Sequence, residues 1–216
     1  LAMERGAVDF VTKPTNIIEA KGDAFRKEIL GILNAVLKTE RISLTERRPA
    51  VAAVSAVQKR NASAETRFKN KIVALACSTG GPKALQSVIP YLPANLDAPM
   101  VLVQHMPAGF TNSMANRLDE ISKINVKEAE NGEILKKGTV YIAPGGKHME
   151  VKKCPDGSHK IVYNDMPPIG GLKPCANITY DSLRTCGYDQ VVCVVLTGMG
   201  ADGTNGILEL SKVKPI

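Results

Sequence analysis

The sequence has few aromatic residues. Phe, Trp and Tyr make up 4% of its 216 residues, and tryptophan is absent. Proteins that bind single-stranded nucleic acid stack the bases on aromatic side chains set among basic ones. The scarcity of aromatics therefore argues against a nucleic-acid partner, despite a formal net charge of +7. Residues 41–70 hold seven Lys/Arg and two Asp/Glu, a net +5, and this segment is typical of a solvated linker.

Cysteine pairs and long apolar runs are also missing. The five cysteines form no C-x-x-C pair and the three histidines are dispersed, so we expect neither a metal site nor a cofactor. Small buried cysteines suit a reducing compartment. No apolar run approaches the roughly 18 residues that span a bilayer, and the N-terminus lacks signal-peptide features. These absences predict a cytoplasmic protein without membrane insertion.

Three regions separate along the chain. Residues 1–40 contain a short apolar strand that ends at Pro14 and a helical pattern over 24–37, too little to bury a core alone. Residues 41–70 form the basic linker. From residue 71 to 216, apolar strands alternate with helical patterns, with strands over 71–77, 99–105 and 190–198. We expect an α/β domain with a mostly parallel, doubly wound sheet, helices on both faces and a β-hairpin formed by 139–153 and 159–165.

Three reactive side chains follow strands of this predicted sheet. Ser78 follows the first strand, His105 ends the second, and Asp202 lies four residues after Gly198 at the end of the last. Ligands of open α/β sheets bind beyond the carboxyl ends of the strands. A serine activated by a histidine, whose far ring nitrogen is held by a carboxylate, is the equipment of nucleophilic acyl transfer.

Each of these residues also has a simpler interpretation. Ser78 or Thr79 could cap the helix that starts at the following glycines. His105 could be a core or rim histidine, and Asp202 a turn or cap residue.

Two other classes of protein stay open. One is a phosphate- or nucleotide-binding module that uses the Ser-Thr-Gly-Gly helix start, although neither a Gly-Lys-Ser/Thr nor a G-x-G-x-x-G pattern is present. The other is a non-catalytic regulatory scaffold. His148 and His159 are interpreted as solvated or loop residues.

Five motifs in order resemble those of the CheB family, the chemoreceptor glutamate methylesterases of bacterial chemotaxis. The resemblance covers residues 71 to about 213 and rests on "ACSTGGPKAL", "VLVQHMPAGFTNSMANRL", "YIAPGGKHMEV", "NDMPPIGGLKPCANITYDSL" and "VVLTGMGADGTNGI". It implies a hydrolase that removes γ-glutamyl methyl esters from the cytoplasmic helices of chemoreceptors, releasing methanol, and that can deamidate receptor glutamines.

The resemblance also implies roles for individual residues. Ser78 would be the nucleophile, His105 the general base and Asp202 the orienting carboxylate. The backbone N–H of Met199 would donate to the oxyanion, and Thr79 would line the same pocket.

The front of the chain resembles the end of a response-regulator receiver domain. Residues 1–40 would be its last strand and closing helix, with Lys13 contacting the phosphoryl group. The resemblance implies phosphorelay control, with a chemotaxis histidine kinase as partner of the full-length receiver and an unphosphorylated receiver that obstructs the active site. The phosphoacceptor aspartate is expected before Leu1, and the catalytic domain is expected to be truncated at its C-terminus.

The chain departs from the commoner family pattern at three positions. Leu172, Cys175 and Asn177 stand where His, Ser and Asp are more usual. We expect these departures to affect contacts with the receptor.

Overall fold

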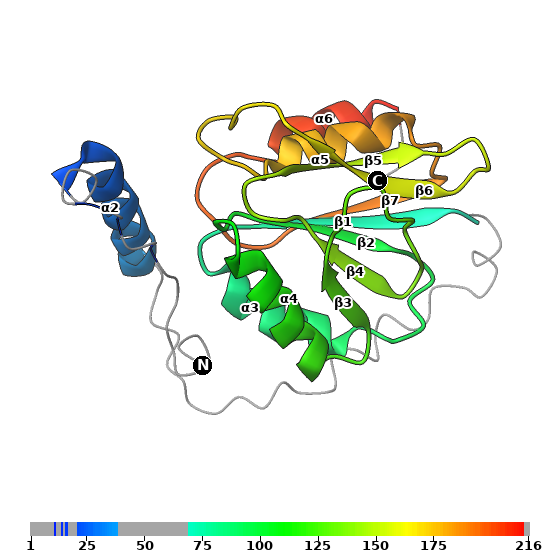
Figure 1. Ribbon diagram of the computed structural model, residues 1–216, viewed down its shortest axis with the longest axis horizontal. Coiled ribbons are helices and arrows are strands. Elements are labelled where there is room, and N and C mark those ends of the chain that lie inside the picture. Colours follow the sequence, from blue (N-terminus) through cyan, green and yellow to red (C-terminus); the bar gives the residue numbers. More distant parts are fainter. Residues whose placement is uncertain (1–10, 12–13, 15, 17–20, 39–68, 214–216) are drawn as a thin grey trace.

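The computed structural model describes residues 11, 14, 16, 21–38 and 69–213. The strand expected before Pro14 and the linker up to residue 68 lie outside these residues. Figure 1 shows the described elements. They are α2 (Asp23–Lys38), β1 (Lys71–Cys77), α3 (Gly81–Val88), the 3-10 helix η2 (Ile89–Tyr91), β2 (Met100–Gln104), α4 (Phe110–Ile121), β3 (Asn125–Glu128), β4 (Thr139–Ile142), β5 (His148–Lys153), β6 (His159–Asn164), α5 (Ala176–Ser182), the 3-10 helix η3 (Leu183–Thr185), β7 (Gln190–Val195) and α6 (Thr204–Ser211).

A five-stranded sheet forms the centre of the fold. Its strand order is β3-β4-β2-β1-β7, and every pair of neighbouring strands is parallel. Helices α3 and α4 cover one face, and α5 and α6 cover the other (Figure 1). This arrangement confirms the predicted α/β class with a parallel sheet buried on both sides.

Alternation along β1 explains why its sequence is apolar throughout. Ile72, Ala74 and Ala76 belong to the core under α5 and α6. Leu75 and Cys77 belong to the core under α3 and α4. Successive side chains of a strand point to opposite faces, so a strand covered on both sides needs an apolar residue at every position.

The predicted hairpin is correct in its second part only. β5 and β6 form an antiparallel pair, His148 opposite Asn164. Residues 139–142, expected in the first hairpin strand, instead form β4 inside the parallel sheet, between β3 and β2. All four side chains of β4 are buried, which requires a strand with both faces covered. The Pro-Gly-Gly turn at 144–146 separates the two strands.

The interpretation of His148 and His159 as solvated or loop residues is wrong. Both side chains are buried on the hairpin, at 0% and 6% exposure. His148 Nε2 lies 3.1 Å from the carbonyl oxygen of Pro167. His159 Nε2 lies 2.6 Å from that of Cys186, and its ring stacks on Tyr188. Packing of the hairpin against α5 and η3 buries histidines that flanking polar residues had made look exposed.

No helix in the described part of the chain is long and apolar enough to cross a membrane.

Candidate active site

A cavity lies where the connections of the sheet change direction. The helix after β1, α3, covers one face, whereas the helix after the neighbouring strand β7, α6, covers the other. The loops that leave these two strands therefore diverge, and such switch points form binding crevices. The cavity, about 130 Å³, is lined by residues 76–78 and 195–200 together with His105 and Asp202. All three predicted reactive side chains meet there.

The turn after β1 presents Ser78 to this cavity. Its N–H donates to the carbonyl oxygen of Thr197 at 2.7 Å, and its own carbonyl oxygen accepts from Gly81 N–H at 2.7 Å. Helix α3 begins after Gly80, which has φ 75, and no side chain caps it. The cap interpretation of Ser78 and Thr79 is therefore wrong. No residue in the described part of the chain hydrogen-bonds the Ser78 hydroxyl, which leaves it available in the cavity.

The loop after β7 packs closely on Ser78. A Cβ atom built at Gly198 would lie 2.7 Å from the Ser78 Cβ, closer than real Cβ atoms come. Only glycine fits this position, so Gly198 allows the backbone of the 197–200 loop to lie against the serine.

The side chain of Asp202 is largely buried and hydrogen-bonds His105. Its Oδ2 lies 2.8 Å from His105 Nε2, with the two side chains 7% and 14% exposed. Three further groups donate to the carboxylate: the Ala176 N–H at 2.6 Å, the Asn177 N–H at 3.0 Å and the Cys175 thiol at 3.1 Å. Burial alone would raise the pKa of Asp202, but hydrogen bonds from His105, Ala176, Cys175 and Asn177 hold it well below the ordinary value. The carboxylate is therefore ionised at neutral pH.

This contact fixes the tautomer of His105. An ionised carboxylate can only accept, so the neutral imidazole carries its proton on Nε2 and keeps a lone pair on Nδ1. Among the described residues, Nδ1 has no hydrogen-bond partner, and His105 lines the same cavity as Ser78. The orientation of the ring toward the aspartate is thus the reverse of that in trypsin-type triads, where Nδ1 faces the aspartate.

Asp202 is not the cap of its own helix. The residue before α6 is Gly203, and no side chain of that turn caps the helix. Two N–H groups there are satisfied by Asn177, whose Oδ1 accepts from Gly203 at 3.1 Å and from Gly206 at 2.8 Å. Asn177 therefore supports the carboxylate with its backbone and the following helix with its side chain.

Sequence reasoning missed these supports. Cys175 and Asn177 were expected to affect receptor contacts, whereas in the structure they contact the carboxylate and its loop. Polar residues near the start of a helix usually indicate a cap of that same helix. The sequence therefore gives no sign that Cys175 and Asn177 contact residues more than twenty positions away.

The remaining predicted residues differ in their placement. Met199 lines the cavity, and its side chain is half exposed. Thr79 is not among the lining residues, and its carbonyl oxygen accepts from the Thr197 hydroxyl at 3.1 Å. Lys13 lies outside the described residues. Gly31 of helix α2 lies near Met199, because a Cβ built at Gly31 would lie 3.3 Å from the terminal methyl of that side chain.

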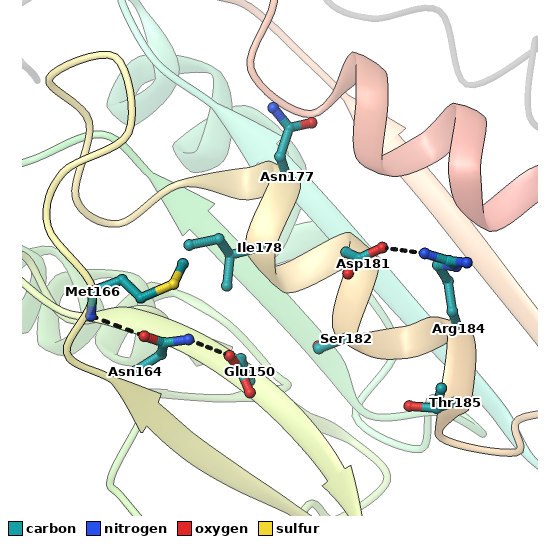
Figure 2. Close-up of a pocket in the computed structure, with 9 residues that line it drawn as sticks. All are labelled: Glu150, Asn164, Met166, Asn177, Ile178, Asp181, Ser182, Arg184 and Thr185. Atoms are coloured by element: carbon teal, nitrogen blue, oxygen red, sulfur yellow. Dashed lines mark hydrogen bonds and ion pairs between the residues drawn. The ribbon is translucent and has the colours of Figure 1, made fainter.

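A larger cavity, about 530 Å³, lies beside α5 and is shown in Figure 2. One side is formed by Glu150, Asn164 and Met166, and the other by six residues between 177 and 185. Each of its charged groups has a partner: Glu150 lies 3.4 Å from Lys152, outside the lining. Arg184 lies 2.8 Å from Asp181, and the Asn164 amide donates to Glu150. No group of His, Cys, Asp or Glu in the described ranges could hold a metal ion.

Comparison with known proteins identifies the family of this chain. The family model for CheB methylesterase matches residues 73–215. The chain belongs to the CheB methylesterase family. The crystal structure of the Thermotoga maritima CheB methylesterase catalytic domain is 44% identical, with a TM-score of 0.64 over 67% of this chain and 76% of that one.

Curated CheB-type relatives extend the similarity along the chain. A protein-glutamate methylesterase/protein-glutamine glutaminase of Geobacillus kaustophilus is 42% identical over 217 residues, which cover 98% of this chain and 59% of the relative. A protein of the same name from Pyrococcus abyssi is 41% identical over 211 residues, which cover 98% of this chain and 56% of the relative. The chain thus spans less than two thirds of the length of these relatives.

The start of α3 bears on the phosphate-binding alternative. An anion site at a helix start needs free backbone N–H groups. In this chain the Gly81 N–H already donates to the carbonyl oxygen of Ser78, and a Cβ at Gly81 would lie 1.9 Å from the side-chain oxygen of Gln104. The Gly81 N–H at the start of α3 is therefore not free for an anion, and the Gln104 side chain lies against this glycine.

Proposed function

We propose that this chain is a protein-glutamate methylesterase: a serine hydrolase that removes γ-glutamyl methyl esters from bacterial chemoreceptors and deamidates receptor glutamines. The observation that carries the proposal is an ionised Asp202 bonded to His105, in the cavity that contains the Ser78 hydroxyl. The curated relatives named protein-glutamate methylesterase/protein-glutamine glutaminase support the same reaction.

In the first step, Ser78 Oγ attacks the carbonyl carbon of the γ-glutamyl ester. Nδ1 of His105 takes the hydroxyl proton, and Asp202 stabilises the imidazolium that forms through its 2.8 Å contact with Nε2. Ser78 and His105 directly follow the neighbouring strands β1 and β2, which matters because the proton must move directly from oxygen to nitrogen.

The tetrahedral intermediate places negative charge on the former carbonyl oxygen. We assign its donor to the backbone N–H of Met199, in the loop that Gly198 brings against the serine. One such donor lowers the barrier by about 3 kcal/mol. Collapse expels the methoxy group, which takes the proton from His105 Nδ1 and leaves as methanol.

Water then completes the reaction. It attacks the carbonyl carbon of the acyl group on Ser78 and gives a proton to His105 Nδ1. The bond from that carbon to Ser78 Oγ then breaks, His105 returns the proton to Oγ, and the glutamate carboxyl group is released. With glutamine in place of the ester, the group that leaves in the first half is ammonia, and the product is again glutamate.

The same proposal covers the rest of the chain. Residues 1–40 are the end of a receiver domain that includes Lys13, residues 41–70 are a linker, and residues 71–216 are the catalytic domain of a cytoplasmic protein. The partners are the cytoplasmic helices of chemoreceptors and a histidine kinase that acts on the receiver. The contact of Gly31 with Met199 supports a receiver that influences the cavity.

The test is methanol release from methylated receptor membranes by the wild-type chain and by Ser78→Ala. We expect methanol release by the wild type and none by Ser78→Ala. Ser182→Ala is the matched control: Ser182 lines the larger cavity and its hydroxyl bonds backbone groups of Val151 and Thr179, so loss of the hydroxyl should lower stability and not release. Release by Ser78→Ala at the wild-type rate would reject the assignment of the nucleophile.

A further inference from the structure

Gln104 is a buried polar residue at the end of β2, directly before His105. Its side chain is 2% exposed, and it is not among the residues that line the active-site cavity. Burying an amide group costs free energy unless each of its polar atoms finds a partner. The identity of these partners therefore indicates why a glutamine occupies this position.

The amide of Gln104 bonds both loops that carry the reacting groups. Its Nε2 donates to the carbonyl oxygen of Ser78 at 3.1 Å and to that of His105 at 3.2 Å. Its Oε1 accepts from the Cys77 thiol at 3.1 Å. Carbonyl oxygens can only accept, so both N–H donors of the amide are used, one on each loop.

These bonds continue the sheet where its ladder ends. The last paired residues of β1 and β2 are Cys77 and Gln104, so Ser78 and His105 are the first residues beyond the pairing. One further backbone bond, from the His105 N–H to the Cys77 carbonyl oxygen, is 3.3 Å long. Past that point, the side chain of Gln104 is the group that bonds both chain segments.

The neighbouring glycine leaves room for the amide. A Cβ atom at Gly81 would lie 1.9 Å from the Gln104 Oε1. The helix start after Ser78 is therefore shaped around this side chain, and the same turn bonds back to Ser78 through the Gly81 N–H.

We propose that Gln104 is a positioning residue for the hydrolysis. Its amide joins the backbone at Ser78 to the backbone at His105 and so sets the distance over which the serine proton moves. This inference rests on the proposed function, in which these two residues are nucleophile and base. Gln104 itself contacts neither substrate nor reacting atoms.

The test compares two variants of Gln104 with a control. Gln104→Met keeps the length of the side chain and removes both donors. Because a misplacement of about 1 Å can cost ~100-fold in rate, kcat should fall ~10- to 100-fold, with KM unchanged. The kcat of Gln104→Glu should lie between that of Gln104→Met and that of the wild type, because burial favours the protonated acid, which keeps one donor.

Tyr141→Phe is the matched control. Tyr141 is 2% exposed and does not line the active-site cavity, and its hydroxyl accepts from the Lys136 N–H and donates to the Ile134 carbonyl oxygen. Its loss also leaves two backbone groups without their partner. We expect a lower Tm, as in Gln104→Met, with wild-type kcat. A wild-type kcat in Gln104→Met, or an equal loss of kcat in Tyr141→Phe, would overturn the proposal.

A second readout separates this inference from the proposed function. Labelling of Ser78 by a fluorophosphonate needs the serine and its base but no receptor, so its rate is measured on the same variants. Slow labelling in Gln104→Met and Gln104→Glu, with wild-type labelling in Tyr141→Phe, supports the positioning role even if receptor membranes release no methanol. That last result would count against the proposed substrate alone. Absence of labelling in the wild-type chain would overturn both.

Discussion

The larger cavity beside α5 and the active-site cavity differ in what their polar groups do. In the larger one, shown in Figure 2, the charged side chains already have partners: Asp181 pairs with Arg184, and Glu150 accepts from the Asn164 amide. In the smaller one, hydrogen bonds hold the Asp202 carboxylate, which contacts His105 Nε2. Nδ1 of His105 and the Ser78 hydroxyl stay free to react. Size favours the first cavity and chemistry favours the second. Convergence of unpaired reactive groups is the better guide to a site.

Helix α5 contributes to both cavities. Backbone N–H groups at its start, from Ala176 and Asn177, donate to the Asp202 carboxylate, which lines the smaller cavity. Side chains along its other face, including Ile178 and Ser182, line the larger cavity. Substitutions on either side of this helix therefore allow direct comparison of the two cavities.

The strongest contrast is between their aspartates. Asp202→Asn removes the charge that stabilises the imidazolium, and kcat should fall ~10²- to 10⁴-fold. Asp181→Asn breaks an exposed ion pair that contributes little to stability, and methanol release should stay at the wild-type level. Steady-state kinetics of both variants checks this. Equal losses in the two would contradict the assignment of the smaller cavity as the site.

Next in size is the effect of crowding Ser78. Gly198→Ala places a methyl group against the serine Cβ and should lower kcat ~10- to 100-fold by displacing the loop. Gly157→Ala is the control: Gly157 has φ +87 in the hairpin turn with open space around it, so alanine there should cost about 1–2 kcal/mol of stability and leave kcat unchanged. Wild-type kcat in Gly198→Ala would refute the close packing.

The link between α5 and α6 should appear in stability. Asn177→Ala leaves the N–H groups of Gly203 and Gly206 without their side-chain acceptor. Loss of such a cap should lower the free energy of unfolding by about 1–2 kcal/mol, measured by urea denaturation. Asn112→Ala, which removes an exposed contact with Asn116 on α4, should change it by less than about 0.5 kcal/mol. Equal values for the two variants would be the opposite result.

Acid should remove the stabilisation that Asp202 provides. Despite its burial, Asp202 has a pKa well below the ordinary carboxyl value of about 3.9, so the folded chain binds this proton less readily than the unfolded chain. The contribution is fully present above the ordinary value and is lost as the pH falls through the folded pKa. The stability advantage of the wild type over Asp202→Asn should therefore shrink between about pH 5 and pH 2. An advantage that grows in acid would contradict this sign.

The smallest effect is expected at Cys175. Its thiol is a weak donor among four on Asp202, so Cys175→Ala should lower kcat only ~2- to 5-fold. Cys175→Ser, with a stronger donor, should restore it. Kinetics that show a loss as large as that of Asp202→Asn would make the thiol, and not the backbone of α5, the main support of the carboxylate.

The sequence predicted the parts of this site that follow from strand periodicity. Ser78, His105 and Asp202 each lie beyond an apolar strand, and parallel strands bring their carboxyl ends together. Gln104 and Cys175 could not be found in this way, because their partners lie 26 and 27 residues away. The division of 139–153 between two sheets also depends on tertiary packing, which a run of apolar residues does not reveal.

The central claim is that Ser78 is a nucleophile activated by His105, and the most direct measurement is peptide mass spectrometry after fluorophosphonate treatment. Serine oxygen displaces fluoride from phosphorus, and the adduct marks the residue that reacted. The account predicts an adduct on Ser78 in the wild type and its loss in His105→Ala. An adduct on another serine, or one on Ser78 that forms equally fast without the histidine, would contradict it.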